Sequence, residues 1–164
     1  MILGIVQARM TSRRLPGKVL RPILGRPMLA WQIDRLRKVG VIGQLIVATS
    51  GESSDDPIAE FCAGIGIGCF RGSLHDVLDR FYQAARQFLP DYVVRWTGDC
   101  PVIDPDIADR TIALIRGADY ASNTLTRTFA DGLDTEVMTF DELAAAWREA
   151  TDEYDREHVT SFIY

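Results

Sequence analysis

The chain has 164 residues, of which 47% are apolar and 25% are charged, and its formal net charge is −5. This length is typical of one domain with a sizeable hydrophobic core, and the acidic balance argues against a protein that binds nucleic acid polymers through a basic face. The sequence contains no apolar run of the ~18 residues that a membrane-spanning helix needs, and its first ten residues lack the charged n-region of a signal peptide.

The first part of the chain predicts two strands and a helix. Residues 2–6 form a continuous run rich in β-branched side chains, which is typical of a strand buried on both faces. After a basic loop, Pro27 suits the first turn of a helix, and apolar residues recur at helical spacing until Gly40 ends it. Residues 44–48 are expected to form the second strand.

Two further helices follow the second strand. Asp56 and Pro57 are expected to be the N-cap and the first residue of one helix. A short strand over residues 67–70 then leads to Ser73. This serine is expected to cap a third helix, whose apolar face recurs over residues 74–85.

The second half of the chain repeats this alternation. Residues 91–96 predict a fourth strand, and Asp104 precedes a Pro at the start of a helix that Gly117 closes. Residues 119–122 and 135–139 predict two more strands.

The C-terminal part is predicted to be helical. Thr139 and Glu142 have the spacing of a capping box, and residues 155–164 are expected to be helical as well. Strands that alternate with helices indicate βαβ units and a largely parallel sheet, which binds ligands beyond the carboxyl ends of its strands. That rule singles out four loops, at residues 7–18, 49–55, 71–73 and 97–104.

The loop after the first strand is unusually basic for an acidic chain. Its sequence, QARMTSRRLPGK, places Arg9, Arg13, Arg14 and Lys18 within ten residues. Guanidinium forks and a compact ammonium are the groups that hold a triphosphate, and this position is the usual one for a phosphate in a doubly wound sheet. Neither the Walker pattern nor GxGxxG is present. The alternative is a solvated loop or an interface with an acidic partner.

Two aspartates follow the fourth strand. Asp99 comes directly after Gly98, where a carboxylate is well placed to hold Mg²⁺, which prefers one or two carboxylates together with phosphate oxygens. The alternative for Asp99 is a turn-forming role. Asp104 is most simply an N-cap.

Other polar residues are less informative. Asp79 and Arg80 lie within the third predicted helix and could be a surface ion pair. The carboxylates of the segment DGLDTEV alternate, so they face either a ligand or water; they belong to Asp131, Asp134 and Glu136.

The cysteines and histidines give no metal signal. The three cysteines are odd in number and show no CxxC spacing, which is typical of reduced, buried thiols in a cytoplasmic protein; they are Cys62, Cys69 and Cys100. The two histidines are far apart, and His75 is expected on a helix surface.

Several segments in this order resemble the sugar-nucleotide cytidylyltransferases. QARMTSRRLPGK is similar to the N-terminal signature of that family, which includes the CMP-KDO synthetases and the acylneuraminate cytidylyltransferases. The family also includes the spore coat polysaccharide biosynthesis protein F group, and among these three groups the chain looks most like that one. Its further motifs stand here as IVATS (46–50), RGSLHDVLDRFYQA (71–84), VVRWTGDCPVIDP (93–105), DGLDTEV (131–137) and REHVT (156–160).

The resemblance implies a fold and a reaction. The fold is that of the nucleotide-diphosphosugar transferases, a Rossmann-like three-layer α/β/α sandwich with a mostly parallel, mixed sheet. The reaction is the Mg²⁺-dependent transfer of CMP from CTP to a sugar acid with release of pyrophosphate, for a cell-surface polysaccharide or glycan. A homodimer is implied as well.

The resemblance also implies roles for individual residues. Those that match the nucleotide-binding loop are Ala8, Arg9, Ser12, Arg14 and Lys18. Asp99 matches the metal-binding aspartate, so Asp99, Arg14 and Lys18 are the catalytic candidates.

Further matches lie outside the basic loop. Ser73, Asp79 and Arg80 fall where the family contacts base and ribose. His158 lies in a segment that approaches the sugar site or the dimer partner, and the other substrate-side candidates are Asp131 and Asp134.

The chain also departs from the family pattern. Thr11 and Arg13 stand where similar sequences often have Gly and Thr, and Arg13 is expected to face solvent. Family members are usually longer, with a second metal-binding aspartate near their C-terminus. We therefore expect residues 1–164 to be a single nucleotidyltransferase domain that lacks the family's C-terminal segment. Two alternatives stay open: a glycosyltransferase of related fold that uses a nucleotide sugar, and a nucleotide-binding module without catalysis.

Overall fold

The structure is a computed structural model that describes residues 1–12 and 14–164. Its centre is strand β1 (Ile2–Gln7), which is buried along most of its length because its side chains are apolar. Strand β4 (Gln44–Ser50) pairs with one edge of β1 and strand β6 (Tyr92–Thr97) with the other, both parallel. The three strands lie where the apolar runs predicted them. Arg13, expected to face solvent, lies outside the described residues.

Three more strands complete a six-stranded sheet of order β5-β4-β1-β6-β8-β7. Strand β5 (Gly68–Gly72) runs parallel to β4. Strand β8 (Glu136–Thr139) is antiparallel to both β6 and strand β7 (Tyr120–Ser122). The predicted mostly parallel, mixed sheet is therefore confirmed.

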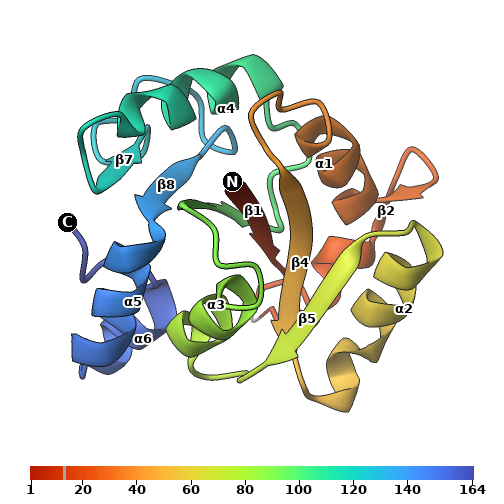
Figure 1. Cartoon of the computed structure of the whole chain (residues 1–164). Coiled ribbons are helices and arrows are strands. Elements are labelled where there is room, and N and C mark those ends of the chain that lie inside the picture. The colour runs from red at the N-terminus through yellow and green to blue at the C-terminus, as the bar shows by residue number, and fades with distance from the viewer. Residues whose placement is uncertain (13) are drawn as a thin grey trace.

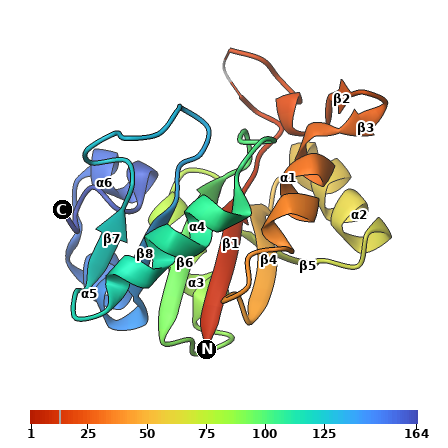
Figure 2. The same cartoon turned by 90° about the horizontal axis from the view of Figure 1, so that it is seen from above.

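Helices cover both faces of this sheet (Figures 1 and 2). One layer holds α1 (Met28–Leu36), α2 (Asp56–Gly64) and α4 (Pro105–Ile112), whose apolar residues join one core cluster. The other layer holds α3 (Val77–Ala85), α5 (Phe140–Glu149) and α6 (Glu153–His158). The side chains of each strand alternate between the two clusters, which confirms the three-layer α/β/α sandwich.

Two predicted helix starts are correct. The Asp104 carboxylate accepts the backbone N–H groups of Asp106 and Ile107 at the start of α4. The Thr139 hydroxyl accepts the N–H of Glu142 at the start of α5. In both cases a short polar side chain satisfies N–H groups that have no partner within the helix.

Two other helix starts were predicted wrongly. Asp76, and not Ser73, is the N-cap of α3, and the Ser73 hydroxyl accepts the Asp76 N–H in the preceding turn. The N-cap of α2 is Asp55 rather than Asp56, but the Asp55 side chain makes no capping hydrogen bond. In both cases the prediction named the right region but the wrong residue, and the observed N-cap is a nearby aspartate.

Further differences concern short elements. Helix α6 ends at His158, because Val159 takes a φ of 68°, so the helix predicted over 155–164 is shorter and begins earlier. A two-stranded hairpin of β2 (Pro22–Ile23) and β3 (Arg26–Pro27) was not predicted. Its turn residues have positive φ angles, which a Gly tolerates readily; they are Leu24 and Gly25. The described residues also include 3₁₀ turns at Lys18–Leu20, Ser53–Asp55 and Ala113–Ile115.

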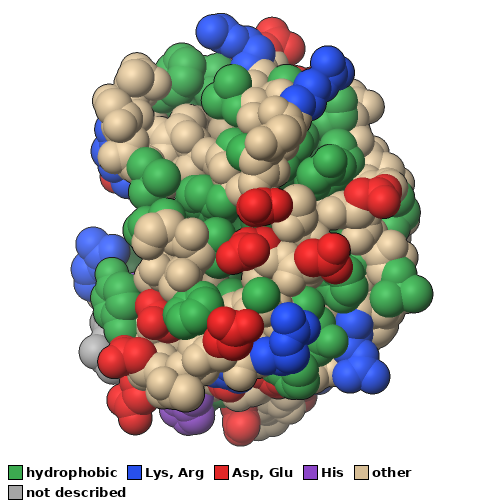
Figure 3. All heavy atoms as spheres, turned by 60° about the vertical axis from the view of Figure 1, so that its left-hand side comes forward, with side chains coloured by type: hydrophobic (Ala, Val, Ile, Leu, Met, Phe, Trp, Pro, Cys, Tyr) green, Lys and Arg blue, Asp and Glu red, His purple; other side chains and the backbone are tan. Residues whose placement is uncertain are grey.

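Two surface properties bear on function. Among the described residues, none of the helices is long and apolar enough to cross a bilayer. The side of the molecule in Figure 3 carries Asp and Glu side chains dispersed among apolar and basic ones, in keeping with the net charge of −5.

Candidate functional site

The carboxyl ends of β1 and β6 meet at one edge of the sheet because the two strands are parallel neighbours. Gly98, just after β6, donates its N–H to the Gln7 carbonyl at 2.8 Å. A Cβ at position 98 would lie 2.8 Å from that oxygen and 3.1 Å from the Ala8 Cβ. Only glycine allows this close approach, which brings the loops after β1 and β6 together.

A cavity of about 300 Å³ lies between these two loops. Its residues come from the basic loop, from the segment after β6 and from α6. Figure 2 shows the loop after β1 at the carboxyl end of that strand, beside the β2–β3 hairpin. The structure thus brings together around one cavity six of the residues predicted from sequence: Ala8, Arg9, Ser12, Arg14, Lys18 and Asp99.

Lys18 and Asp99 form the clearest contact in this cavity. The Lys18 ammonium donates to the Asp99 carboxylate at 2.6 Å. Burial alone would raise the pKa of Asp99, but hydrogen bonds from Lys18 and Thr97, together with the charge of Lys18, outweigh burial and hold this pKa below its ordinary value. Asp99 is therefore an ionised carboxylate in a mainly cationic cavity.

The basic loop is closed by its own backbone. Gly17 has a φ of 70°, which glycine adopts without strain, and donates its N–H to the Met10 carbonyl at 2.7 Å. This contact encloses the segment between Met10 and Gly17, and the 3₁₀ turn that follows starts with Lys18. Arg9, just before this closed segment, and Lys18, just after it, therefore line the same cavity.

A second cavity of about 240 Å³ continues the first and shares several of its lining residues. It brings in Arg80 from α3 and His158 from α6. Arg80 is 1% exposed, and one of its guanidinium N–H groups donates to the Ser73 carbonyl. Burial and the nearby charge of Arg9 lower the pKa of Arg80 to about 10, so it stays a cation at neutral pH.

A third cavity of about 200 Å³ lies beyond His158. Asp134 lines it together with Arg127, with which it is paired at 3.3 Å. Asp131 also pairs with Arg127, at 3.0 Å, but its side chain is 89% exposed and does not line this cavity. The structure thus places two of the three substrate-side candidates beside the cleft, and Asp131 at its outside.

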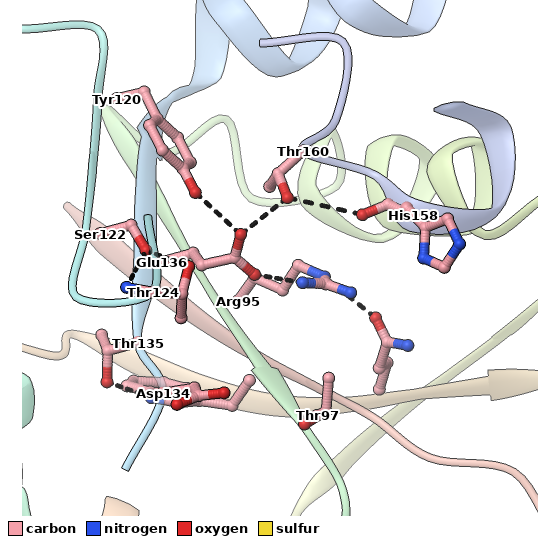
Figure 4. A network of polar contacts seen from close by, with 12 residues as sticks. Arg95, Thr97, Tyr120, Ser122, Thr124, Asp134, Thr135, Glu136, His158 and Thr160 are labelled. Atoms are coloured by element: carbon pink, nitrogen blue, oxygen red, sulfur yellow. Dashed lines mark hydrogen bonds and ion pairs between the residues drawn. The ribbon is translucent and has the colours of Figure 1, made fainter. Parts of the chain in front are cut away.

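A buried polar network joins the second and third cavities (Figure 4). Glu136 is its acceptor: Arg95 donates to one carboxylate oxygen, and the hydroxyls of Tyr120 and Thr160 donate to the other at 2.8 and 2.7 Å. Arg95 also donates to the Gln7 side chain at 3.1 Å. Sequence alone left open whether Glu136 faces a ligand or water; in the structure it faces these three protein donors.

Two sequence-predicted residues are not brought into the cleft by their side chains. The Asp79 carboxylate accepts from the Trp147 indole at 2.8 Å and from Gln83 at 3.1 Å, and Asp79 lines none of the three cavities. Ser73 reaches the site only through its carbonyl and Arg80. Their predicted contacts with base and ribose stay predictions.

Sequence reasoning did not single out several residues that line the cleft. The most notable is Glu157, which lines both of the first two cavities and lies 3.8 Å from Arg9. Thr97 lines all three cavities. Position at the end of β6 was a usable signal for Thr97. Glu157 lies within the REHVT motif, but the motif alone did not show that its side chain faces the cleft, because this depends on how α6 packs.

The site offers one carboxylate suited to a divalent cation. Mg²⁺ is usually held by one or two carboxylates with the remaining positions taken by water and substrate phosphates. Asp99 fits the role of a single protein ligand, since it is ionised and lies among cations that attract phosphate. No group of three or more His, Cys, Asp or Glu residues suited to a metal ion occurs within residues 1–12 and 14–164, so substrate oxygens would have to complete the coordination.

Comparisons with known proteins agree with this geometry. The chain is 42% identical over 165 residues to an uncharacterised protein of Methanocaldococcus jannaschii, covering 99% of this chain and 67% of that protein. It is 37% identical over 169 residues to the spore coat polysaccharide biosynthesis protein SpsF of Bacillus subtilis, covering 99% and 69%. The match to a 3-deoxy-manno-octulosonate cytidylyltransferase of Geobacter metallireducens is 32% identical over 126 residues and spans about half of that enzyme, 48%.

A solved structure and a family model complete the comparison. A cytidylyltransferase from Leptospira borgpetersenii superposes with a TM-score of 0.93 at 34% identity, covering 99% of this chain and 70% of that one. The family model described as cytidylyltransferase matches residues 3–164. With the cationic loop, the carboxylate and the sheet edge in the arrangement described above, the chain belongs to the cytidylyltransferase family of nucleotidyltransferases.

Proposed function

We propose that this protein transfers CMP from CTP to a sugar acid with release of pyrophosphate, in the biosynthesis of a cell-surface polysaccharide or glycan. The observation that carries the proposal is a cavity lined by Arg9, Arg14, Lys18 and Asp99 at the carboxyl ends of two parallel strands, with Lys18 paired to Asp99. The sugar-acid acceptor is supported by similarity to 3-deoxy-manno-octulosonate cytidylyltransferases, and the polysaccharide role by similarity to the spore coat protein.

In this mechanism the protein positions charge and takes no covalent part. A sugar oxygen attacks the α-phosphorus of CTP, and the electron pair of the breaking P–O bond leaves with pyrophosphate. Arg14 and Lys18 neutralise the charge that grows on that leaving group. Asp99 would hold Mg²⁺, which when bound withdraws charge from the phosphate oxygens.

The sugar acid would occupy the far part of the cleft. The second and third cavities extend from the cationic cavity past Arg80 to His158 and Asp134. Arg80 and the neutral side chains of Gln7 and Thr97 in the second cavity suit a nucleoside. His158 and Asp134 suit hydroxyl groups of the acceptor. A homodimer and a further C-terminal segment are part of the proposal, and they rest on the family resemblance alone.

The first test is thermal stabilisation by Mg²⁺ with CTP, UTP, ATP or GTP in turn. A ligand at 100 times its Kd stabilises a protein by ~2.7 kcal/mol, which for a domain of this size raises Tm by roughly 5–10 °C. We expect this shift with CTP and no comparable shift in Lys18→Ala. CTP with a panel of keto sugar acids should then release pyrophosphate. Release of a nucleoside diphosphate from a nucleotide sugar would instead indicate a glycosyltransferase, and binding without turnover a module without catalysis.

The catalytic assignment makes a separate prediction. Loss of one preorganised electrostatic contact to a transition state typically costs ~3–4 kcal/mol, or about a hundredfold to a thousandfold in rate. Lys18→Ala and Asp99→Ala should each lower kcat at least about a hundredfold while circular dichroism shows a folded protein. Near-normal turnover in either variant would remove that residue from the mechanism.

A further inference from the structure

Asp55 has an unusual environment for a helix N-cap. It is 0% exposed and precedes α2, yet its carboxylate makes no hydrogen bond to that helix. One of its oxygens accepts the backbone N–H of Met10 at 2.7 Å. The other accepts the N–H of Ser50 at 3.1 Å and the Ser50 hydroxyl at 2.5 Å. The side chain therefore joins the end of β4 to the basic loop, 45 residues away in sequence.

A buried carboxylate is costly unless donors compensate for its lost hydration. Asp55 has three such donors, and the negative charge of Asp55 also acts on the buried guanidinium of Arg80, whose pKa it raises against the effect of burial. A residue that only capped α2 would not need these hydrogen bonds to Ser50 and Met10. The contact to Met10 is the one that reaches another part of the chain.

Met10 is held from both sides. Its N–H donates to Asp55, and its carbonyl accepts the Gly17 N–H at 2.7 Å. Arg9, which precedes Met10, and Ser12, two residues after it, both line the cationic cavity. A fixed Met10 backbone therefore restrains where those two side chains start, and the closed loop also places Arg14 and Lys18 at the cavity.

We propose that Asp55 is a positioning residue that holds the basic loop in its binding geometry through the Met10 N–H. The identity of the ligand rests on the proposed function; the effect on the loop does not. A loop that is ordered before the ligand arrives leaves less conformational entropy to be lost on binding. Loss of the Met10 contact should therefore weaken nucleotide affinity even where the rest of the fold is unchanged.

Asp55→Asn tests the contact selectively. The carboxamide has one acceptor oxygen and one NH₂ group. The Ser50 side supplies two donors and the Met10 side supplies one, so the oxygen is expected to face Ser50 and the NH₂ group to face the Met10 N–H. Two donors then oppose each other at Met10, and the loop loses its anchor.

Ser50→Ala is the matched control. It removes the hydroxyl that donates to Asp55, and with it a weak acceptor for the Glu52 N–H at 3.3 Å, but it leaves the Met10 contact in place. Ser50 lines none of the three cavities. If Asp55 contributed only to overall stability, the two variants would show the same loop exchange and the same CTP affinity when each is measured at the same interval below its own Tm.

The experiment compares the wild type with both variants by amide hydrogen exchange of residues 8–18 and by CTP titration. We expect the loop to exchange about tenfold faster or more, and the Kd for CTP to rise by a similar factor, in Asp55→Asn. Both quantities should stay within about twofold of the wild type in Ser50→Ala. Unchanged loop exchange in Asp55→Asn, or an equal increase in both variants, would overturn the proposal.

The role of Asp55 can still be decided if the wild type does not bind CTP or if Asp55→Asn does not fold. If the wild type binds no CTP, the proposed function fails, while the contrast in loop exchange still decides the role of Asp55. If Asp55→Asn does not fold, the Met10 amide of the wild type decides it: slow exchange relative to other amides of the loop supports the proposal, and exchange at the rate of an open loop overturns it.

Discussion

At the scale of single residues, the ion pair between Lys18 and Asp99 fixes how these two side chains are arranged before a ligand binds. The two side chains are 26% and 40% exposed, so the pair is open to water and a ligand can compete for either partner. A phosphate would take Lys18, and a divalent cation would take Asp99. Until then the pair holds the two side chains beside each other, with the ammonium 2.6 Å from the carboxylate.

This contact predicts a dependence of stability on pH. The folded pKa of Asp99 lies below its ordinary value of 3.8 because the Lys18 and Thr97 hydrogen bonds outweigh burial, which acts in the opposite direction. The stabilisation is fully present above the unfolded pKa and is lost as pH falls through the lower folded pKa. The Tm difference between the wild type and Asp99→Asn should thus shrink from neutral pH to about pH 3. A constant difference over that range, measured by calorimetry, would contradict the contact.

Gly98 makes a second prediction at this scale. A Cβ at this position would press on the Gln7 carbonyl, which belongs to the backbone and cannot rotate away. Gly98→Ala should lower the stability by about 1–3 kcal/mol, as overpacking does, and separate the two loops that form the cavity. Its thermal shift with CTP should shrink as well. Gly64→Ala is the control, because a Cβ at position 64 meets nothing within 4 Å. Equal behaviour of the two variants in the Tm and CTP assays would refute this explanation.

At the scale of elements, the start of α4 uses one of two aspartates that lie close in sequence, and the other faces the cavity. Asp104 caps the helix with two backbone hydrogen bonds, whereas Asp99 faces the cavity. Asp104 lines none of the three cavities of the cleft. The capping role of Asp104 and the proposed binding role of Asp99 are therefore separable by mutation.

Asp104→Ala should lower the stability by about 1 kcal/mol, which corresponds to a Tm decrease of about 2–4 °C. Its thermal shift with CTP should equal that of the wild type. Asp104→Asn keeps an acceptor for the same N–H groups and should retain most of the stability. A loss of the CTP shift in a folded Asp104→Ala protein would mean that this carboxylate also contributes to binding.

At the scale of the whole molecule, Glu136 connects parts of the chain that are distant in sequence. Its donors lie on β6, on β7 and just after α6, and Arg95 extends the network to Gln7 at the end of β1. Figure 4 shows these side chains converging on one carboxylate. The antiparallel half of the sheet and the segment that follows α6 are thereby fixed relative to the parallel half that carries the cationic loop.

Removal of one partner from a buried ion pair leaves an uncompensated charge and typically costs about 3–5 kcal/mol. Arg95 and Glu136 have side chains only 12% and 10% exposed. Glu136→Ala should therefore reduce the free energy of unfolding in urea by about that amount. Asp34→Ala breaks the exposed pair with Arg26 and should cost about 0–1 kcal/mol. Similar losses in the two variants would show that the Glu136 network contributes no more than a surface pair.

The elements and their order were predictable because their signals are local. Continuous apolar runs identified β1, β4 and β6, and turn and capping chemistry placed the starts of α4 and α5. The same local signals failed at Ser73, because Asp76 three residues later is the observed cap, and at the β2–β3 hairpin, whose strands have two residues each.

The sequence by itself determined the α/β architecture, the basic loop after the first strand and the position of Asp99 after the fourth predicted one. It did so because periodicity, turns and charge are properties of neighbouring residues. Only the tertiary structure decided that Asp79 contacts Trp147, that Glu157 faces Arg9 and that Asp55 holds Met10. Each of these contacts joins segments far apart in the chain, and which segments meet depends on the strand order and on helix packing against the sheet, which no local pattern encodes.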